Sequence, residues 1–180
     1  ASGLTQARFA VADVATLDLP AASVDAVVSV FGLFFLDDMP GVLRRAWSWL
    51  APSGRLAITV WGREVLAPGE PLFWDAVRRE DPTLDHISPA DRLDSPERLA
   101  SLFAAAELPA PEIAREAWRM PLASPEAFWP VILGTSNRGV FETLSPEARV
   151  RVRTSVLDAL RRDHVDGLDC EALVAIAGPA

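Results

Sequence analysis

The chain has 180 residues, enough for one domain with a substantial buried core, and half of its residues are hydrophobic. Its formal net charge is −8 and all 17 of its basic residues are arginine, which argues against a broad nucleic-acid-binding face. No apolar run approaches the roughly 20 residues that cross a bilayer, and the single cysteine excludes an internal disulfide and a multi-cysteine metal site. We therefore expect a cytoplasmic protein that has no nucleic-acid or membrane partner and no metal site.

Two segments near the start of the chain predict strands. Residues 8–14 (RFAVADV) predict a short strand that ends near Asp13. Residues 25–31 (DAVVSVF) predict a strand buried on both faces, because three valines occur without polar alternation. Gly32 follows and is expected to allow a tight turn. Ligands of open α/β sheets bind beyond the carboxyl ends of the strands, so Gly32 is predicted to lie at the edge of a site.

A helix and another strand come next. Asp37 or Asp38 is expected to cap the helix, with Pro40 in its first turn. The turn at 51–54 (APSG) ends this helix and leads into a predicted strand over 55–61 (RLAITVW). Two strands joined through one helix predict a right-handed, parallel βαβ unit.

Three Ser-Pro-Glu triplets, at 95–97, 124–126 and 145–147, predict three later helices. In each triplet the serine suits the N-cap, the proline suits the first helical position, and the glutamate lies near the positive end of the helix dipole. Residues 112–119 and 171–177 predict two further strands. Strands and helices therefore alternate along most of the chain, as expected of an α/β fold.

The order and spacing of these segments resemble a known family. Residues 9–20 (FAVADVATLDLP), 23–38 (SVDAVVSVFGLFFLDD) and 43–62 (LRRAWSWLAPSGRLAITVWG) resemble class I S-adenosylmethionine-dependent methyltransferases, in particular the ubiquinone-biosynthesis-type small-molecule branch. The tail is similar to that branch at 126–129 (EAFW) and 144–149 (LSPEAR). The resemblance implies a Rossmann-like sheet of parallel strands with an antiparallel C-terminal strand. It also implies S-adenosylmethionine as cofactor and a small-molecule methyl acceptor.

The resemblance also implies residues that bind the cofactor. Asp13 would accept a hydrogen bond from the adenine amino group, and the backbone of Val14 would contact the ring. Val30, Phe31 and Gly32 would line the methionine end of the cofactor. From the residues by themselves, an aspartate such as Asp13 more often caps a turn, and Phe31, Phe34 and Phe35 more often belong to a hydrophobic core.

The candidates for the acceptor pocket are Phe34, Phe35, Trp61 and His86. The variable segment 62–94, which surrounds a short helix predicted at 72–80, would lie near this pocket. Three more tryptophans would either shape the pocket or belong to the core: Trp74, Trp118 and Trp129. No catalytic residue is expected, because the sulfonium methyl group is already activated and the protein must mainly align the acceptor.

Two signatures of the family are missing from the sequence. None of the ten glycines forms a G-x-G pair, and no second strand ends in an acidic residue that would bind the ribose. In the family's strand order, 3-2-1-4-5-7-6, strands 1 and 2 would separate the strands predicted at 8–14 and 25–31 by roughly 14 Å. We therefore expect strands 1 and 2 to be absent, and residues 1–180 to form the C-terminal portion of a methyltransferase domain that binds its cofactor weakly.

Other interpretations of this gap remain open. In one alternative, the strands predicted at 8–14 and 25–31 pair directly with each other in a rearranged sheet. In another, a second copy of the chain fills the gap by strand exchange and forms a homodimer. The competing function is a non-catalytic, methyltransferase-like module for dimerisation or partner binding. A nicotinamide-binding site is a weaker alternative, because its glycine fingerprint is equally missing.

Overall fold

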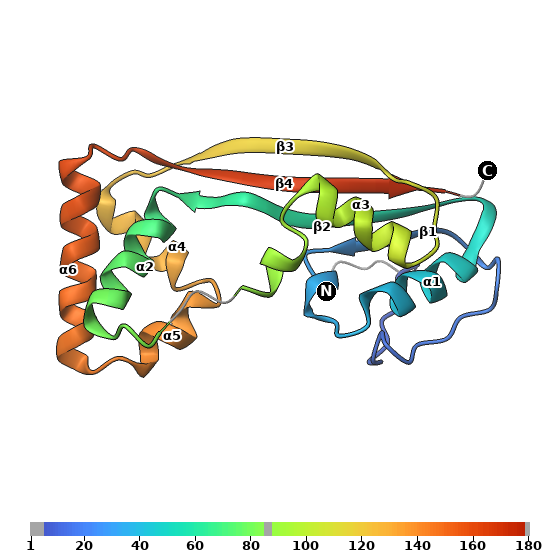
Figure 1. Cartoon of the computed structure of the whole chain (residues 1–180), viewed down its shortest axis with the longest axis horizontal. Coiled ribbons are helices and arrows are strands. Elements are labelled where there is room, and N and C mark those ends of the chain that lie inside the picture. Colours follow the sequence, from blue (N-terminus) through green and yellow to red (C-terminus); the bar gives the residue numbers. More distant parts are fainter. Residues whose placement is uncertain (1–5, 85–87, 179–180) are drawn as a thin grey trace.

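The structure is a computed structural model that describes residues 6–84 and 88–178. Its strands form one four-stranded sheet in the order β1-β2-β4-β3 (Figure 1). The strands are β1 (Val24–Val30), β2 (Leu50–Ala67), β3 (Glu112–Pro121) and β4 (Gly167–Ala177). β1 and β2 are parallel, whereas β4 is antiparallel to both of its neighbours. This arrangement confirms the predicted α/β class, including the antiparallel C-terminal strand.

The helices lie on one side of the sheet in the view of Figure 1. They are α1 (Met39–Trp49), α2 (Gly69–Glu80), α3 (Pro96–Ala105), α4 (Phe128–Ile132), α5 (Asn137–Thr143) and α6 (Pro146–Arg162). Short 3₁₀ turns occur at η1 (Leu33–Phe35), η2 (Pro89–Arg92) and η3 (Pro125–Ala127). Among the described residues, no helix is both long enough and apolar enough to cross a membrane.

The predicted helix starts are confirmed. Asp38 caps α1 by accepting a hydrogen bond from the backbone N–H three residues later, at 2.9 Å. Ser95 and Ser145 cap α3 and α6 in the same way, at 3.3 Å and 3.2 Å. Ser124 precedes η3 and α4 without a side-chain cap bond to the backbone. Local capping chemistry therefore fixes where these elements begin.

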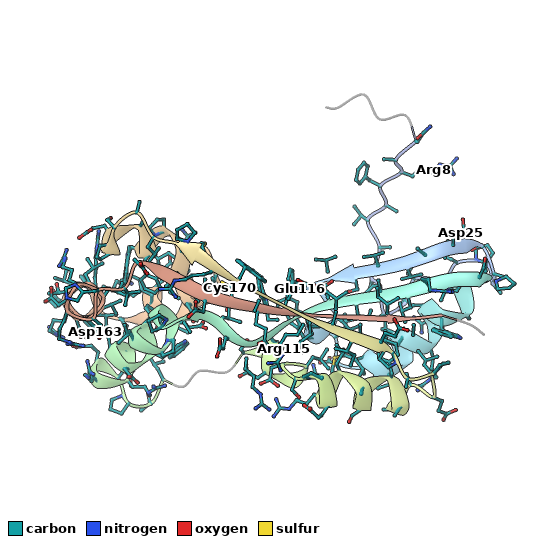
Figure 2. All side chains as sticks on the ribbon, turned by 90° about the horizontal axis from the view of Figure 1, so that it is seen from above. Arg8, Asp25, Arg115, Glu116, Asp163 and Cys170 are labelled. Atoms are coloured by element: carbon teal, nitrogen blue, oxygen red, sulfur yellow. The ribbon has the colours of Figure 1, made fainter. Side chains whose placement is uncertain are left out.

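The sheet contributes to two hydrophobic cores because it twists. Leu173, Ala175 and Ala177 of β4 pack in a first core with α1 and α3. Leu168 and Cys170 of the same strand pack in a second core with α2, α4 and α6. Alternate residues of a strand point to opposite faces, so the two cores use opposite faces of β4. Figure 2 shows β3 crossing β4 between the two groups of helices, as this twist requires.

The strand predicted at 8–14 does not form. These residues have no strand hydrogen bonds, and Phe9 and Val11 are fully exposed. Figure 2 shows Arg8 on a segment that rises away from β1. The prediction was wrong because an apolar segment becomes a strand only where a neighbouring strand pairs with it, and none of the described strands does.

β1 was predicted to be an inner strand buried on both faces, and this was also wrong. It lies at the edge of the described sheet and pairs only with β2. Val28 and Val30 are 64% and 59% exposed because no helix covers their face of the strand. Only the face of Val27 packs against the first core. In this chain, an apolar run without polar alternation therefore does not show that other elements cover both faces of the strand.

Candidate functional site

The chain turns sharply where β1 ends. Phe31 has a φ of 51°, in the left-handed region that residues other than glycine seldom adopt. Gly32, which was expected to make this turn, has an ordinary φ of −120°. The backbone N–H of Phe31 donates to the carbonyl of Thr59 at 2.9 Å, which extends the β1–β2 ladder by one residue. The strained residue at the strand exit is thus the phenylalanine, and such strain is typical of functional sites.

Three aromatic rings, which we call the aromatic ladder, run across the sheet from this turn. The ring of Phe31 stacks on Trp61 of β2 with 4.0 Å between centroids and 15° between planes. Trp61 in turn contacts Trp118 of β3 at 6.3 Å and 39°. The ladder therefore connects the carboxyl end of β1 with β3, the strand at the opposite edge of the sheet.

A cavity of about 220 Å³, which we call the smaller cavity, lies beside β1 and α1. Its apolar lining includes Val14 and Gly32, two of the residues predicted to bind the cofactor, together with Val27, Leu36 and Trp49. The structure thus brings the segment after Asp13 to the exit of β1, although that segment is not a strand. Val30 and Phe31, which were also predicted, lie in the chain between the lining residues Ser29 and Gly32, and Val30 is exposed.

Asp13 caps a turn in the structure. Its side-chain Oδ1 accepts the backbone N–H of Ala15 at 2.8 Å, and its carbonyl accepts the N–H groups of Thr16 and Leu17. This is the geometry expected of an aspartate in a tight turn. The turn presents Val14 to the smaller cavity.

A larger cavity, of about 330 Å³, opens between the two groups of helices. Trp61 and Trp118 of the aromatic ladder form part of its wall, and Cys170 of β4 lines it as well. The rest of the described lining comes from β2, α2, the 88–94 segment, β3, α4 and α5. Its volume lies within the range of small-molecule pockets, about 300 to 1,000 Å³.

A hydrogen-bonded group forms the polar end of this cavity. Asn137 is 3% exposed, and its side-chain N–H group donates to Glu70 Oε1 at 2.7 Å and to Thr135 Oγ1 at 3.0 Å. The Thr135 hydroxyl donates to the carbonyl of Ile132 at 2.7 Å. Glu70 lies in the first turn of α2, where the helix dipole favours a negative charge. The Glu70 carboxylate is therefore held in a fixed position in the wall.

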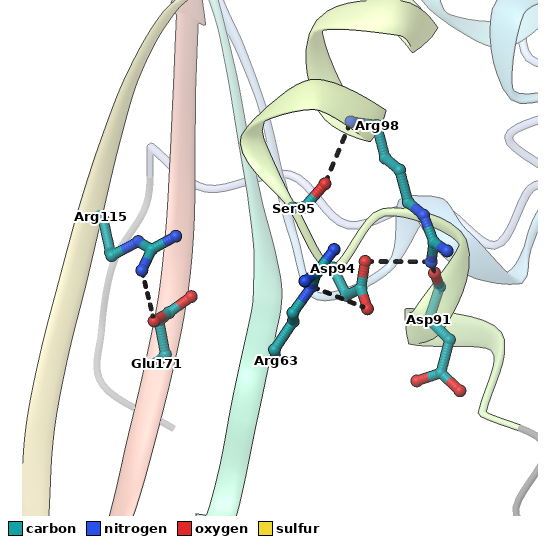
Figure 3. A network of polar contacts seen from close by, with 7 residues as sticks. All are labelled: Arg63, Asp91, Asp94, Ser95, Arg98, Arg115 and Glu171. Carbon is teal, nitrogen blue, oxygen red and sulfur yellow. Dashed lines mark hydrogen bonds and ion pairs between the residues drawn. The ribbon is translucent and has the colours of Figure 1, made fainter.

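Ion pairs line the rim of the same cavity (Figure 3). Asp94 Oδ2 lies 3.8 Å from Arg63 Nε, and Asp94 Oδ1 accepts from Arg98 Nη1 at 3.0 Å. Arg98 also donates to the backbone carbonyl of Asp91. Figure 3 shows the Asp91 carboxylate turned away from Arg98 and Asp94. The charge of Asp94 is therefore matched by two guanidinium groups.

A further ion pair lies behind the rim. Glu171 of β4 is nearly buried, and its Oε2 lies 3.4 Å from Arg115 Nη1 (Figure 3). The pKa of the Glu97 carboxyl is lowered below its ordinary value of 4.5. The largest causes are hydrogen bonds from its own backbone N–H and from the Ser95 hydroxyl, followed by the charges of Arg63 and Arg115. Among the described residues, no group of three or more histidine, cysteine and carboxylate side chains could hold a metal ion.

Four other aromatic residues considered for the acceptor pocket lie apart from the larger cavity. Phe34 is buried in the first core, and its carbonyl accepts from Arg92 Nη1 at 3.2 Å. Phe35 is 66% exposed and contacts the ring of Phe34. Trp74 and Trp129 are buried in the second core. His86 lies outside the described residues.

Sequence reasoning missed the polar end of the larger cavity. Glu70 lies in the variable segment just before the helix predicted at 72–80, and Asn137 lies in a short helix without a distinct motif. They are separated by 67 positions in the chain. No local pattern relates residues so far apart, so only the fold could show that they meet.

Comparison with known proteins identifies the fold. Residues 1–58 match the model of a family described as a methyltransferase domain. No match was found among the curated proteins. A solved structure from Anaeromyxobacter dehalogenans, described as a type II methyltransferase, has a TM-score of 0.56 and 18% identity, with 96% of this chain and 73% of that chain covered.

Two further solved structures have similar folds. A protein from Bacillus halodurans described as a methyltransferase has a TM-score of 0.52 and 11% identity, covering 94% of this chain and 76% of that one. A protein described as a methyltransferase of an antibiotic biosynthesis pathway in Anabaena variabilis has a TM-score of 0.51 and 14% identity, covering 90% and 70%. Residues 1–58 thus match a methyltransferase-domain family, and the fold of the described residues is similar to that of these solved structures.

Proposed function

We propose that the chain takes part in methyl transfer from S-adenosylmethionine to a small-molecule acceptor. The observation that carries this proposal is the position of the aromatic ladder. It begins at the carboxyl end of the parallel strand β1, where open α/β sheets bind ligands, and it ends in the wall of the larger cavity. The two ends would serve cofactor and acceptor respectively.

The described residues fit part of the cofactor. The smaller cavity is apolar and suits a flat ring, with Val14 and Gly32 in its lining and Phe31 beside it. Asp13 would meet the adenine amino group only by opening its turn, because its Oδ1 is engaged by Ala15. When bound, S-adenosylmethionine supplies an activated methyl group, so the protein has to align the acceptor and exclude water. Trp61 would orient the acceptor, with His86 as the other proposed contact.

We also propose that residues 1–180 act as the C-terminal portion of a methyltransferase domain. The order β1-β2-β4-β3, with β4 antiparallel, corresponds to strands 4-5-7-6 of the family's sheet. The free edge of β1 is where the absent strands would extend the sheet. Without a glycine-rich loop or a ribose-binding carboxylate, the 180 residues by themselves should bind the cofactor more weakly than the micromolar range.

Ligand-observed NMR with saturation transfer tests the proposed cofactor, because it detects weak binding. S-adenosylhomocysteine added to the full 180-residue chain should receive saturation at its adenine and ribose protons, and S-adenosylmethionine should compete with it. NAD should receive little, which separates this proposal from the nicotinamide alternative. The absence of saturation at millimolar ligand would refute the proposal, and micromolar affinity measured by calorimetry would refute the expected weakness.

The uncovered edge of β1 favours a second candidate function, a dimerisation or partner-binding module. An edge strand with exposed valines is a template for pairing with another chain. Sedimentation over a range of concentrations separates the two candidates. A stable dimer that Val28→Lys dissociates, together with no binding of S-adenosylhomocysteine, would favour the module.

A further inference from the structure

One face of the sheet forms the floor of the larger cavity. Trp118 of β3 lies directly opposite Cys170 of β4, and Trp61 of β2 lies opposite Ala172. Residues two apart on a strand point to the same face, so Trp61, Trp118 and Cys170 project together. Met120 follows Trp118 by two residues and lines the cavity as well. The floor therefore consists of two indole rings and two sulfur-containing side chains.

This floor favours a flat aromatic molecule. Trp118 is 44% exposed, and its ring lies 6.3 Å from that of Trp61, whose orientation is restrained by the stacked ring of Phe31. A planar ring gains from offset stacking or an edge-to-face contact with an indole, and its edge makes favourable contacts with sulfur. A saturated molecule of similar shape gains only apolar burial. The floor thus distinguishes aromatic from aliphatic ligands.

The charged side chains of the described lining are already engaged within the protein. Arg63 pairs with Asp94 at the rim (Figure 3). Glu70 accepts from Asn137 at 2.7 Å, and both Glu70 and Asp91 have further interactions. A ligand with a formal charge would have to displace one of these partners or give up its hydration without gaining a new one, and both cost free energy. The lining therefore favours an uncharged ligand.

The volume of the cavity limits the size of this ligand. At about 330 Å³ it lies near the lower end of the range for small-molecule pockets, about 300 to 1,000 Å³. Val65, Leu66 and Val131 complete the apolar part of the lining. One or two fused rings with small substituents suit this volume, whereas a long aliphatic tail would extend into solvent.

We propose that the larger cavity binds an uncharged aromatic molecule of one or two rings, which stacks on Trp118 and contacts Trp61, Met120 and Cys170. This inference deepens the proposed function and rests on it only for the role of the bound molecule as methyl acceptor. It specifies the class of the acceptor, and it does not specify the atom that receives the methyl group.

A first set of probes tests the requirement for a flat ring, with affinities measured by calorimetry. 2-Naphthol is flat and uncharged at neutral pH, and decahydro-2-naphthol has the same skeleton in saturated form. 2-Naphthol should bind about three- to tenfold more tightly, because stacking adds to apolar burial. The saturated alcohol is at least as apolar, so equal or tighter binding of it would overturn the inference.

A second set tests the requirement for an uncharged ligand. 2-Naphthamide and 2-naphthoate have nearly the same shape, but the carboxylate carries a formal charge. The amide should bind about tenfold more tightly than the carboxylate, and also more tightly than the cation 2-naphthylmethylammonium. If either ion binds as tightly as the amide, the inference is wrong.

The two methionines of the chain locate the bound ring without any substitution. Met120 lines the larger cavity, whereas Met39 is buried in the first core. With methyl-labelled methionine, saturating 2-naphthol should shift the NMR signal of the Met120 methyl group through the ring current and leave that of Met39 unchanged. Equal shifts of both signals, a shift of Met39 alone, or no shift at saturation would contradict the proposed position.

A matched pair of variants tests the role of the indole ring. Trp118→Leu keeps an apolar side chain but removes the stacking surface, so it should abolish the preference for 2-naphthol over its saturated counterpart. The control Phe35→Leu removes a ring that is 66% exposed and lies outside the described lining, and it should keep the preference. Loss of the preference in both variants, or in neither, would refute the inference. The methionine signals decide the question if Trp118→Leu does not fold.

All of these titrations use the full chain without cofactor, so they separate this inference from the proposed function. Binding of S-adenosylhomocysteine without binding of 2-naphthol would refute this inference alone. Binding of 2-naphthol without binding of S-adenosylhomocysteine would refute the proposed function alone.

Discussion

The exit of β1 shows how a single residue shapes the site. Phe31 takes the left-handed conformation that the sequence suggested for Gly32, and its stacking on Trp61 offsets part of the strain. A methyl group at Gly32 would lie 3.8 Å from its nearest neighbours, an ordinary contact. The glycine is therefore not required for the turn, and its conformational freedom is not what positions the aromatic ladder.

Another glycine is required for packing. A Cβ at Gly69, where α2 begins, would lie 2.4 Å from the buried ring of Phe128 and 2.9 Å from Leu168. Gly69→Ala should therefore lower the free energy of unfolding by about 1–3 kcal/mol, as measured by urea denaturation.

The control for this substitution is Gly139→Ala in α5. A Cβ there would meet nothing within 4 Å. Since alanine favours helices over glycine, this variant should be unchanged or more stable by up to about 1 kcal/mol. If the two variants lose equal stability, the packing around Gly69 is not as described.

At the scale of the elements, the helix caps offer a matched comparison. Ser145 caps α6, and its Oγ accepts the N–H of Ala148 at 3.2 Å, whereas Ser124 makes no such bond. Ser145→Ala should cost about 1 kcal/mol and lower the melting temperature by about 2–4 °C, as measured by thermal unfolding.

Ser124→Ala belongs to the same Ser-Pro-Glu pattern but should change the melting temperature much less. Similar losses in both variants would mean that the sequence pattern, rather than the observed cap bond, determines the stability of these helix starts.

The elements also show what the sequence could and could not predict. Caps, the parallel βαβ unit and the strands at 112–119 and 171–177 were predicted because their signals are local: a serine before a proline, or a run of apolar residues between turns. The segment 8–14 has the same apolar character but remains unpaired and exposed. Whether this segment forms a strand depends on a partner strand, and no local sequence signal indicates that such a partner is present.

The same limit applies to the candidate site. Trp61 was predicted as a substrate contact, and the structure places it in the wall of the larger cavity. Phe34 and Phe35 both lie in η1, just after β1 ends. Phe34 is buried in the core, whereas Phe35 is exposed to solvent. The Glu70–Asn137 bond joins residues from distant parts of the chain. Only tertiary structure could bring these groups together.

At the scale of the whole molecule, ion pairs between elements give stability a dependence on pH. Glu80 of α2 forms a two-point contact with Arg151 of α6, at 2.6 Å and 3.0 Å. This hydrogen bonding lowers the pKa of Glu80 below its ordinary value of 4.5. The pair therefore stabilises the fold above that value, and its contribution is lost as the pH falls through the lowered pKa.

The variant Glu80→Gln tests this contribution. At neutral pH it should be less stable than the parent chain, and in acid the two stabilities should converge, as measured by denaturant unfolding across the acidic range. The exposed Glu142, on α5, lies 3.8 Å from Arg138 and serves as a control site. A difference between Glu80→Gln and the parent that persists unchanged in acid would show that the ion pair is not its cause.

The central claim is that the carboxyl end of β1 faces an adenosyl ligand. Amide chemical shifts of the isotope-labelled chain, followed during titration with S-adenosylhomocysteine, test it most directly. The predicted result is that perturbations cluster at Val14 and at residues 30–33, and that Val14→Asp, which places a charge in the smaller cavity, abolishes them while Val150→Asp on α6 does not. Perturbations confined to other elements, or none at millimolar ligand, would contradict the claim.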